Sequence, residues 1–399
     1  MRTPIALVTT ALVATLLAVV PGAPTLATPV PAVERLCLGQ PVTIVGTPDR
    51  ALDGTGGDDV ILTNGARDIR GRAGADLLCV TGPRTGDITI DAGPGDDRVV
   101  VQSRAGADML VELGEGADLF RGGSGDDEVL SGEPGEDDDI STGPGDDRVS
   151  VAGSGRVAGG PDRDSVQVAT ADGDVTVDLP AGTVTSAGRA LRLDDVETVS
   201  TGSREGTTTV IGTPGDDAVG VFGRVSTRLG AGADSLSLAL PYEASPFEVA
   251  GGPGRDRLSM SDGYDPDTEV PLAIDALEGL ATSPTGVRVD FSGFETYRGD
   301  APRLDITGTD ADDDLSAFGC EVTLRGGGGD DDLELVQGPV VDAWGCYPED
   351  YLVYGNAGDD VMLGTAKPDL LVGGGGRDVA DGRGGYDECR AEVRRSCER

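Results

Sequence analysis

Residues 355–387 read GNAGDDVMLGTAKPDLLVGGGGRDVADGRGGYD. Within this stretch Asp360, Asp369, Asp378 and Asp387 follow one another at intervals of nine residues. The repeated unit is G-x-x-G-x-D-x-U, where U is Val, Leu, Ile or Met. Glycine permits a positive φ and suits a tight turn, whereas x-U-x has the alternation of a very short strand. The stretch therefore predicts that turns and strands alternate along the chain.

The same unit recurs through most of the sequence. Near-identical copies occupy residues 122–129 and 326–333. Two nine-residue units make a coil of eighteen residues, and the slightly longer central steps predict coils of about nineteen to twenty-one residues. The motif aspartates outside the first stretch are Asp59, Asp68, Asp76, Asp97, Asp108, Asp118, Asp127, Asp137 and Asp147, followed by Asp164, Asp217, Asp234, Asp256, Asp313 and Asp331.

The segments between dense repeat blocks also predict strands. Residues 175–179 and 287–291 alternate apolar and polar residues as half-buried strands do. No stretch combines a sustained helical period with capping residues, so we expect little helix beyond the first residues and the last dozen. The sequence predicts an all-β protein, a parallel β-roll or β-solenoid whose intermediate segments continue the same stack.

Composition restricts what the chain can bind. It contains 64 Gly and only 4% aromatic residues among 399, too little bulk for a large core. Acidic residues outnumber basic ones by 71 to 31, and the formal net charge of −40 opposes binding to nucleic acid or insertion into an anionic membrane. Acidic disorder is the alternative, but an apolar content of 38% in short Val, Leu and Ile clusters favours folding. The charge implies a cationic partner.

At this point the sequence resembles the haemolysin-type, or RTX, calcium-binding repeat, whose nonapeptide is G-G-x-G-x-D-x-U-x. The resemblance covers most of residues 46–389, with gaps near 170–210 and 260–305. It implies that the six-residue turns bind Ca²⁺ between adjacent coils, through aspartates and turn carbonyls such as those of Gly358 and Gly376. The implied metal ligands are Asp59, Asp68, Asp76, Asp97, Asp108, Asp118, Asp127, Asp137, Asp147, Asp313, Asp331, Asp360, Asp369, Asp378 and Asp387.

Calcium chemistry agrees with this implication, because Ca²⁺ takes six to eight oxygen ligands in a flexible geometry. A site needs two motif turns one coil apart, and isolated copies such as Asp164 and Asp256 are weaker candidates. The best pairs are Asp360 with Asp378, Asp369 with Asp387, Asp97 with Asp118, Asp108 with Asp127, and Asp118 with Asp137.

Two turns depart from the repeat motif, and the role of the second aspartate in many turns has two interpretations. Lys367-Pro368 before Asp369, and one extra residue before Ile140, mark turns that we expect to be distorted or empty. The neighbouring aspartates Asp96, Asp126 and Asp359 have two readings: a solvated charge, or a carboxylate that assists the ion without touching it.

The first residues and the cysteines indicate export. An early Arg2, an apolar run over 5–20 and small residues up to Ala27 are typical of a secretory signal peptide cleaved near Ala27. Six cysteines in an exported chain favour disulfides. Proximity suggests the pairs Cys37–Cys79, Cys320–Cys346 and Cys389–Cys397, although six cysteines allow fifteen pairings.

The expected organisation has six parts. They are a signal peptide (1–27), an N-terminal capping segment (28–45), an RTX-like repeat block (46–166), a degenerate solenoid segment (167–305), a C-terminal RTX-like repeat block (306–388) and a disulfide-closed C-terminal cap (389–399).

Other chemistries have less support. The absence of His removes Ser-His-Asp catalysis and His-based zinc sites, and no basic patch suits nucleic acid. The alternative function is a β-helix enzyme, of lyase or epimerase type, acting on an acidic polysaccharide. Residues 343–354 hold Trp344, the only Trp, and three of the seven Tyr. They either pack over the solenoid edge or contact a cell-surface glycan or protein.

The expected function is that of a secreted, extracellular calcium-binding repeat protein rather than an enzyme. Without Ca²⁺, carboxylates stacked about 4.8 Å apart repel one another, and a thin apolar interior cannot compensate. On the order of ten ions would offset about half of the net charge, and their binding free energy becomes folding free energy. The expected role is structural, or associated with a surface or matrix.

Overall fold

The computed structural model describes residues 35–82, 86–102, 106–132, 136–169, 172–241, 246–262, 270–336 and 350–398. Every regular element in these ranges is a β-strand, and no helix in them is able to cross a membrane. The chain separates into a unit of residues 1–35 and a unit that runs from Leu36 to Arg399. The predicted signal peptide lies outside the described residues.

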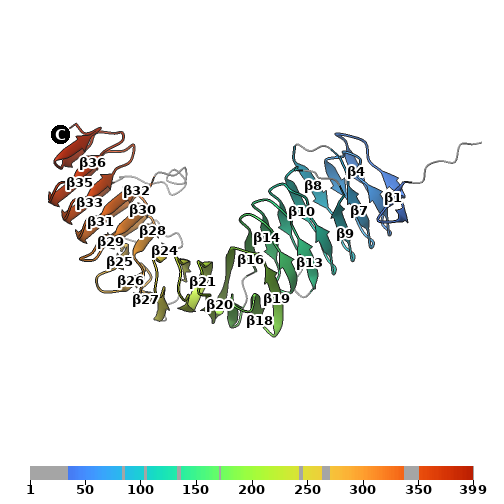
Figure 1. The fold of residues 1–399 in the computed structure, drawn as a ribbon, viewed down its shortest axis with the longest axis horizontal. Helices are drawn as coiled ribbons and strands as arrows, with labels where there is room; N and C mark the ends of the chain where they lie inside the picture. Colours follow the sequence, from blue (N-terminus) through green and yellow to red (C-terminus); the bar gives the residue numbers. More distant parts are fainter. Residues whose placement is uncertain are drawn as a thin grey trace, which may run out of the picture. The chain divides into compact units, whose positions relative to one another are not determined.

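The second unit is a parallel β-solenoid, as the sequence predicts (Figure 1). Each regular coil places one strand on each of two stacks, face A and face B, and most neighbouring strands of a face pair in parallel. In β10, for example, Val111 lies beside Ile90 of the preceding coil and Val129 of the next. This parallel order arises because every coil turns the chain in the same direction before the next strand is added.

Face A contains the following strands in stacking order. They are β3 (Ile44–Val45), β5 (Val60–Leu62), β7 (Leu77–Val80), β9 (Arg98–Val101), β11 (Leu119–Arg121), β13 (Asp138–Ser141), β15 (Gly155–Ala158), β19 (Arg189–Asp194), β18 (Thr183–Ser186), β17 (Val175–Asp178), the second halves of β20 (Thr198–Ile211) and β21 (Ala218–Arg228), β23 (Phe247–Ala250), β27 (Arg288–Ser292), β26 (Leu280–Thr282), β25 (Leu272–Asp275), β29 (Arg303–Thr307), β31 (Glu321–Gly328), β33 (Asp350–Ala357), β35 (Asp369–Gly375) and β37 (Glu388–Arg390).

Face B stacks in sequence order. Its strands are β4 (Ala51–Asp53), β6 (Asp68–Arg70), β8 (Ile88–Asp91), β10 (Met109–Glu112), β12 (Glu128–Leu130), β14 (Arg148–Val151), β16 (Ser165–Val168), the first halves of β20 and β21, β22 (Ser235–Leu240), β24 (Arg257–Asp262), β28 (Thr296–Asp300), β30 (Asp314–Phe318), β32 (Asp332–Leu335), β34 (Val361–Leu363), β36 (Val379–Asp381) and β38 (Val393–Arg395).

The interior between the two faces is narrow and apolar. In β8 (Ile88-Thr89-Ile90-Asp91) the isoleucines are buried and the two polar residues are exposed. This alternation is expected of a strand that has one face in the core and the other in solvent. Val, Leu and Ile dominate the core cluster, and Phe120 is its largest fully buried side chain. Three-residue strands such as β11 and β12 bury only one such residue each, so the interior is thin.

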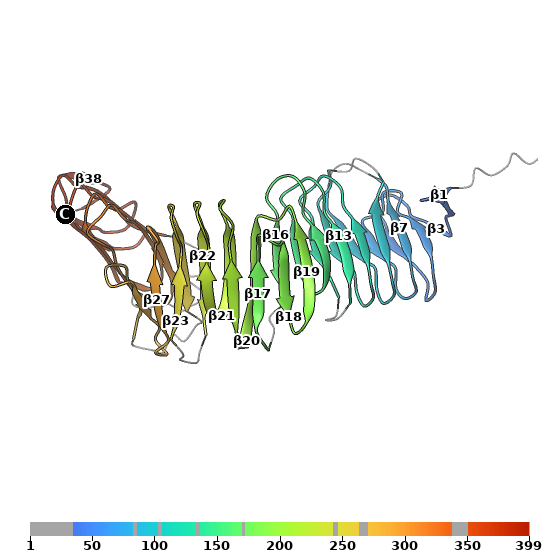
Figure 2. The same cartoon turned by 60° about the horizontal axis from the view of Figure 1, so that its bottom comes forward.

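Two antiparallel meanders interrupt the regular coils and explain the gaps in the repeat. Strands β17, β18 and β19 pair antiparallel in sequence (Figure 2). Strands β25, β26 and β27 do the same. The β18–β19 turn places Ala187 and Gly188 at φ values of 49° and 78°, as a tight two-residue hairpin requires. The predicted strands at 175–179 and 287–291 are confirmed as β17 and β27, and both belong to face A.

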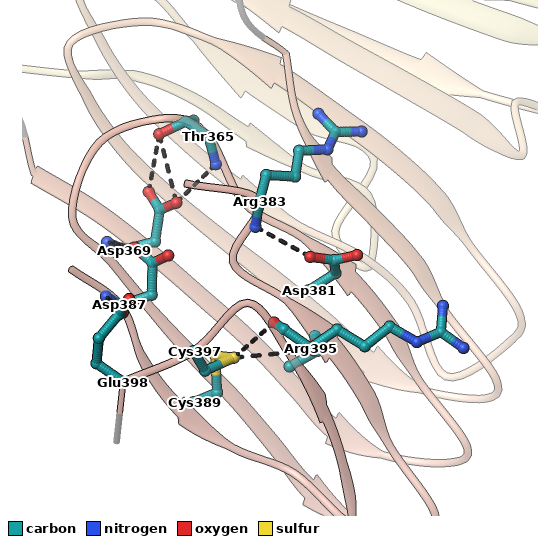
Figure 3. The surroundings of a disulfide bond; sticks show 10 residues. Thr365, Asp369, Asp381, Arg383, Asp387, Cys389, Arg395, Cys397 and Glu398 are labelled. Carbon is teal, nitrogen blue, oxygen red and sulfur yellow. Dashed lines mark hydrogen bonds between the residues drawn. A yellow bond between two sulfur atoms is a disulfide. The ribbon is translucent and has the colours of Figure 1, made fainter. Parts of the chain in front are cut away.

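Disulfides close the two ends of the solenoid. Cys37 bonds Cys79, which brings the small hairpin of β1 (Leu36–Cys37) and β2 (Gln40–Pro41) onto face A. Cys389 of β37 bonds Cys397, which follows β38 (Figure 3). Both pairings are confirmed, whereas Cys346, the predicted partner of Cys320, lies outside the described residues. The predicted boundaries at 166 and 305 fall inside β16 and β29, where strand pairing is continuous.

Candidate functional site

The motif turns lie along the two edges where the chain passes between the faces. Edge I joins each face B strand to the next face A strand, and edge II joins face A back to face B. In most turns an aspartate stands two residues before the buried apolar residue of the following strand, as Asp127 precedes Val129. Because strand residues two apart share a side, this aspartate also points to the inner side of the coil.

The first glycine of the motif is required by close packing between coils. A Cβ on Gly122 would lie 2.0 Å from the carbonyl oxygen of Thr142 in the next coil and 2.8 Å from Asp127 Oδ2. Real Cβ atoms do not approach an oxygen so closely, so only glycine allows the two turns to stack at this distance.

The inner aspartates of successive coils form hydrogen-bonded ladders. In each step the backbone N–H of one aspartate donates to Oδ1 of the aspartate one coil later, at 2.7–3.1 Å. On edge I the steps are Asp59–Asp76, Asp76–Asp97, Asp97–Asp118, Asp118–Asp138 and Asp369–Asp387. On edge II they are Asp127–Asp147, Asp147–Asp164, Asp217–Asp234, Asp234–Asp256, Asp313–Asp331, Asp331–Asp360 and Asp360–Asp378.

The second oxygen of most ladder aspartates is buried without a hydrogen-bond partner. This unpartnered Oδ2 occurs, among the described residues, in Asp76, Asp97, Asp118, Asp127, Asp147, Asp164, Asp234, Asp256, Asp331, Asp360, Asp378 and Asp387. Burial of an ionised oxygen that lacks a partner costs free energy. Burial raises the pKa of Asp97 to about 7 and that of Asp127 to about 8, against the smaller opposing effect of the backbone N–H bonds.

The space beside several of the unpartnered Oδ2 atoms is lined by oxygen and suits a hard cation. A Cβ on Gly355 would lie 2.1 Å from Asp360 Oδ2 and 2.7 Å from the carbonyl oxygen of Gly373, so both oxygens face one small space beside the glycine. No group of three or more acidic, His or Cys side chains converges within the described ranges. A Ca²⁺ ion here would take one or two carboxylates and complete its shell with turn carbonyls, which suits its flexible demand for oxygen.

The outer aspartate of each turn forms a second, exposed ladder in the opposite direction. Asp126 N–H donates to Asp108 Oδ1 at 3.0 Å, and Asp146 N–H donates to Asp126 Oδ1 at 3.0 Å. Asp96 and Asp359 accept bonds in the same way from Ala117 and Arg377. These carboxylates therefore tie neighbouring coils together, in addition to any role beside an ion.

Twelve of the fifteen predicted ligand positions lie on the inner ladders, and three lie beside them. The ladder positions expected near Asp108 and Asp137 belong to Met109 and Asp138, one residue later, and Asp108 and Asp137 are exposed. Asp68 begins β6, where it accepts a 3.0 Å bond from Arg70 Nη2. The ladder position is two residues before the buried apolar residue of the strand. Each of these three aspartates stands one residue away from that position.

The predicted pairs divide in the same way. Asp360–Asp378, Asp369–Asp387 and Asp97–Asp118 are direct ladder steps, whereas Asp127 accepts from Met109 and Asp118 donates to Asp138. The Asp369 turn keeps its ladder bond despite Lys367-Pro368. Sequence reasoning missed Asp138, gave too little weight to Asp164, Asp217, Asp234 and Asp256, and missed the ladder acceptors Glu197, Glu295, Glu392 and Glu398.

The comparisons with known proteins identify the turns. Residues 111–133 and 354–389 match the RTX calcium-binding nonapeptide repeat, in four copies. No curated protein matches the chain. The matched segments contain the ladder aspartates Asp118 and Asp127 and the C-terminal series from Asp360 to Asp387. These two segments of the chain therefore carry RTX calcium-binding repeats.

Proposed function

We propose that this chain is a secreted protein that folds when its stacked turns bind several Ca²⁺ ions between adjacent coils, and that its role is structural or associated with a cell surface or matrix. The observation that carries the proposal is the row of buried, unpartnered Oδ2 atoms, several of which, such as that of Asp360, lie beside a carbonyl of the next coil. The residues proposed to bind the ions are those with the unpartnered oxygen, together with the carbonyls of the adjoining turns.

Coupling of binding to folding follows from the composition of the interior. The chain carries a formal net charge of −40, and its ladders place carboxylates one strand spacing apart. The apolar interior offers one residue per strand in the shortest strands. When bound, a divalent cation supplies positive charge where the folded coil concentrates negative charge, and only the folded coil presents both halves of a site.

Export is supported by the cysteines and by the N-terminal sequence. Disulfides such as Cys37–Cys79 and Cys389–Cys397 persist in oxidising compartments and are rare in the cytosol. Extracellular calcium, at about millimolar concentration, suits modules with Kd values of about 10⁻⁴–10⁻³ M. In this proposal the chain remains extended inside the cell and folds outside it.

Circular dichroism of the secreted, disulfide-bonded protein tests the coupling. The β signal should be weak after chelation and should appear on titration to millimolar Ca²⁺, while Mg²⁺ at the same concentration should be less effective because it demands stricter octahedral geometry. Isothermal calorimetry should give a stoichiometry of on the order of ten ions. An unchanged β signal in chelator, or no measurable binding of Ca²⁺, would refute the proposal.

A further inference from the structure

The ladder aspartates are of two kinds, distinguished by the partner of the second oxygen. In the first kind Oδ2 is unpartnered and buried. In the second kind a threonine four residues earlier supplies the partner, as Thr213 N–H donates to Asp217 Oδ2 at 2.6 Å and Thr213 Oγ1 lies 3.0 Å from Asp217 Oδ1. The second kind comprises Thr55–Asp59, Thr213–Asp217, Thr309–Asp313 and Thr365–Asp369, the last drawn in Figure 3.

The threonine turns stand at the beginning of ladders. Asp217, for example, donates its N–H forward to Asp234, and its own Oδ1 accepts from Thr213 Oγ1 rather than from a backbone N–H of the preceding coil. Asp59, Asp313 and Asp369 likewise donate forward, to Asp76, Asp331 and Asp387. The threonine therefore donates hydrogen bonds to a carboxylate that accepts none from an aspartate of the preceding coil.

A glutamate ends four of the five ladders described above. Glu197 Oε2 accepts from Asp164 N–H at 2.7 Å, and Glu295 Oε2 accepts from Asp256 N–H at 2.8 Å. Glu392 and Glu398 do the same for Asp378 and Asp387. At these four positions the glycine-rich turn is replaced by an apolar residue that packs on the core and directly precedes the glutamate. The apolar residues are Val196, Phe294, Ala391 and Cys397.

Along edge II a glutamate end is followed directly by a threonine start at two places. Glu197 precedes the Thr213 turn by one coil, and Glu295 precedes the Thr309 turn by one coil. The unpartnered Oδ2 atoms of edge II therefore fall into three groups. They are Asp127, Asp147 and Asp164, then Asp234 and Asp256, and then Asp331, Asp360 and Asp378.

We infer that edge II carries three separate rows of cation sites, divided by two metal-free joints, the first formed by Glu197 with the Thr213 turn and the second by Glu295 with the Thr309 turn. The inference rests on the calcium binding proposed above and specifies which turns take part. A buried anionic Oδ2 without a partner favours a nearby cation, whereas the Oδ2 atoms of Asp217 and Asp313 already accept hydrogen bonds and gain less from one. In a solenoid each coil contacts only its neighbours, so the three rows load and unload separately.

Hydrogen exchange on the secreted, disulfide-bonded protein tests the separation. In Asp256→Asn the Oδ1 acceptor for Asp234 remains, and the anionic Oδ2 becomes an amide. At the lowest Ca²⁺ concentration that protects the unmodified protein, β22, β23 and β24 of this variant should exchange at least about tenfold faster, while β12–β16 and β32–β36 keep their protection. The matched control is Glu248→Gln, an exposed change in the same row that should leave all three rows protected. Equal loss of protection in all three rows would overturn the inference.

A second variant tests the metal-free joint directly. Asp217→Asn removes the charge of a carboxylate whose Oδ2 already accepts a hydrogen bond from Thr213 N–H. Calorimetry should show as many Ca²⁺ ions per chain as in the unmodified protein, whereas Asp256→Asn, which changes an unpartnered Oδ2, should bind one ion fewer. The loss of an ion in Asp217→Asn would overturn the metal-free joint. If the unmodified protein binds no Ca²⁺, the proposed function fails together with this inference. If it binds Ca²⁺ but the variants behave otherwise than stated, only the inference fails.

Discussion

The backbone N–H of Asp97 donates a 2.7 Å hydrogen bond to Oδ1 of Asp118, 21 residues later and one coil further along the solenoid. The same carboxylate leaves Oδ2 buried without a partner. One oxygen of Asp118 therefore holds neighbouring coils in register, and the other is free for a cation. The two roles belong to different atoms and can be separated by substitution.

Asp118→Asn and Asp118→Ala should separate these roles. Asn keeps an acceptor for the Asp97 N–H and loses only the anionic oxygen, whereas Ala also leaves that N–H unsatisfied. In saturating Ca²⁺ the Ala variant should be less stable than the Asn variant by about 1–3 kcal/mol, the cost of a buried donor without a partner. Urea unfolding followed by circular dichroism measures the difference. Equal stability of the two variants would show that the ladder bond contributes nothing.

The glycine beside Asp360 Oδ2 should be essential for metal binding at that turn. In Gly355→Ala the new methyl group would stand 2.1 Å from Asp360 Oδ2, inside the oxygen-lined space. We expect calorimetry to show a loss of one Ca²⁺ per chain and a higher Ca²⁺ midpoint for folding, because the methyl group excludes the ion and crowds the next coil.

The control for this change is Gly56→Ala, at a turn glycine whose added Cβ meets nothing within 4 Å. It should bind as many ions as the unmodified protein. If Gly355→Ala also binds the full number, the space beside Gly355 is not the ion site.

The position of the ladder residues is a feature that the sequence could have given more accurately. The nine-residue spacing identifies Asp360, Asp369, Asp378 and Asp387 correctly, because those turns have constant length. In the central coils the loops vary in length, and counting from aspartate to aspartate selects Asp137 in place of Asp138. Counting back two residues from the buried Ile140 selects Asp138, because strand alternation places both side chains on the inner side.

Other features depend on contacts between distant residues. Glu295, which directly precedes β28, accepts a hydrogen bond from the backbone N–H of Asp256, 39 residues earlier. The residues around Glu295 in the sequence do not show that it is the last acceptor of a ladder. The meanders are also non-local, since β17 and β19 belong to face A only through their pairing with β20 and β15. A single sequence predicts their strands from alternation but not the neighbours of those strands.

Without calcium, stability should fall as the pH rises. Burial raises the pKa of Asp97 and Asp331 to about 7 and that of Asp127 to about 8 in the folded chain, above the ordinary value of 3.8. Because the folded state binds these protons more tightly than the unfolded state, their contribution is complete below about pH 4 and is lost as the pH passes through 7–8. The calcium-free protein should therefore show more β signal and a higher Tm at pH 5 than at pH 8.

The same protons compete with the metal. The apparent affinity for Ca²⁺ should increase between pH 5.5 and pH 8, because a ligand carboxylate must lose its proton before it binds an ion. Calorimetry at a series of pH values measures both the affinity and the protons released. A calcium-free protein that becomes more stable toward pH 8 would contradict the assignment of these buried carboxylates.

The C-terminal disulfide should protect the last coil and little else. Cys389, buried on β37, bonds Cys397, which follows β38, so the bond links the final strands of the two faces across the interior (Figure 3). Its loop spans 8 residues, for which the chain-entropy model gives about 2.5 kcal/mol of stabilisation. In Cys389→Ser/Cys397→Ser, residues 382–398 should exchange faster in saturating Ca²⁺, because Glu398 no longer stays against Asp387.

The matched change at the other end, Cys37→Ser/Cys79→Ser, should loosen β1 and β2 and leave residues 382–398 protected. Since coils contact only their neighbours, a loss of protection that spreads from either end through the central coils would mean that the solenoid folds as one cooperative unit.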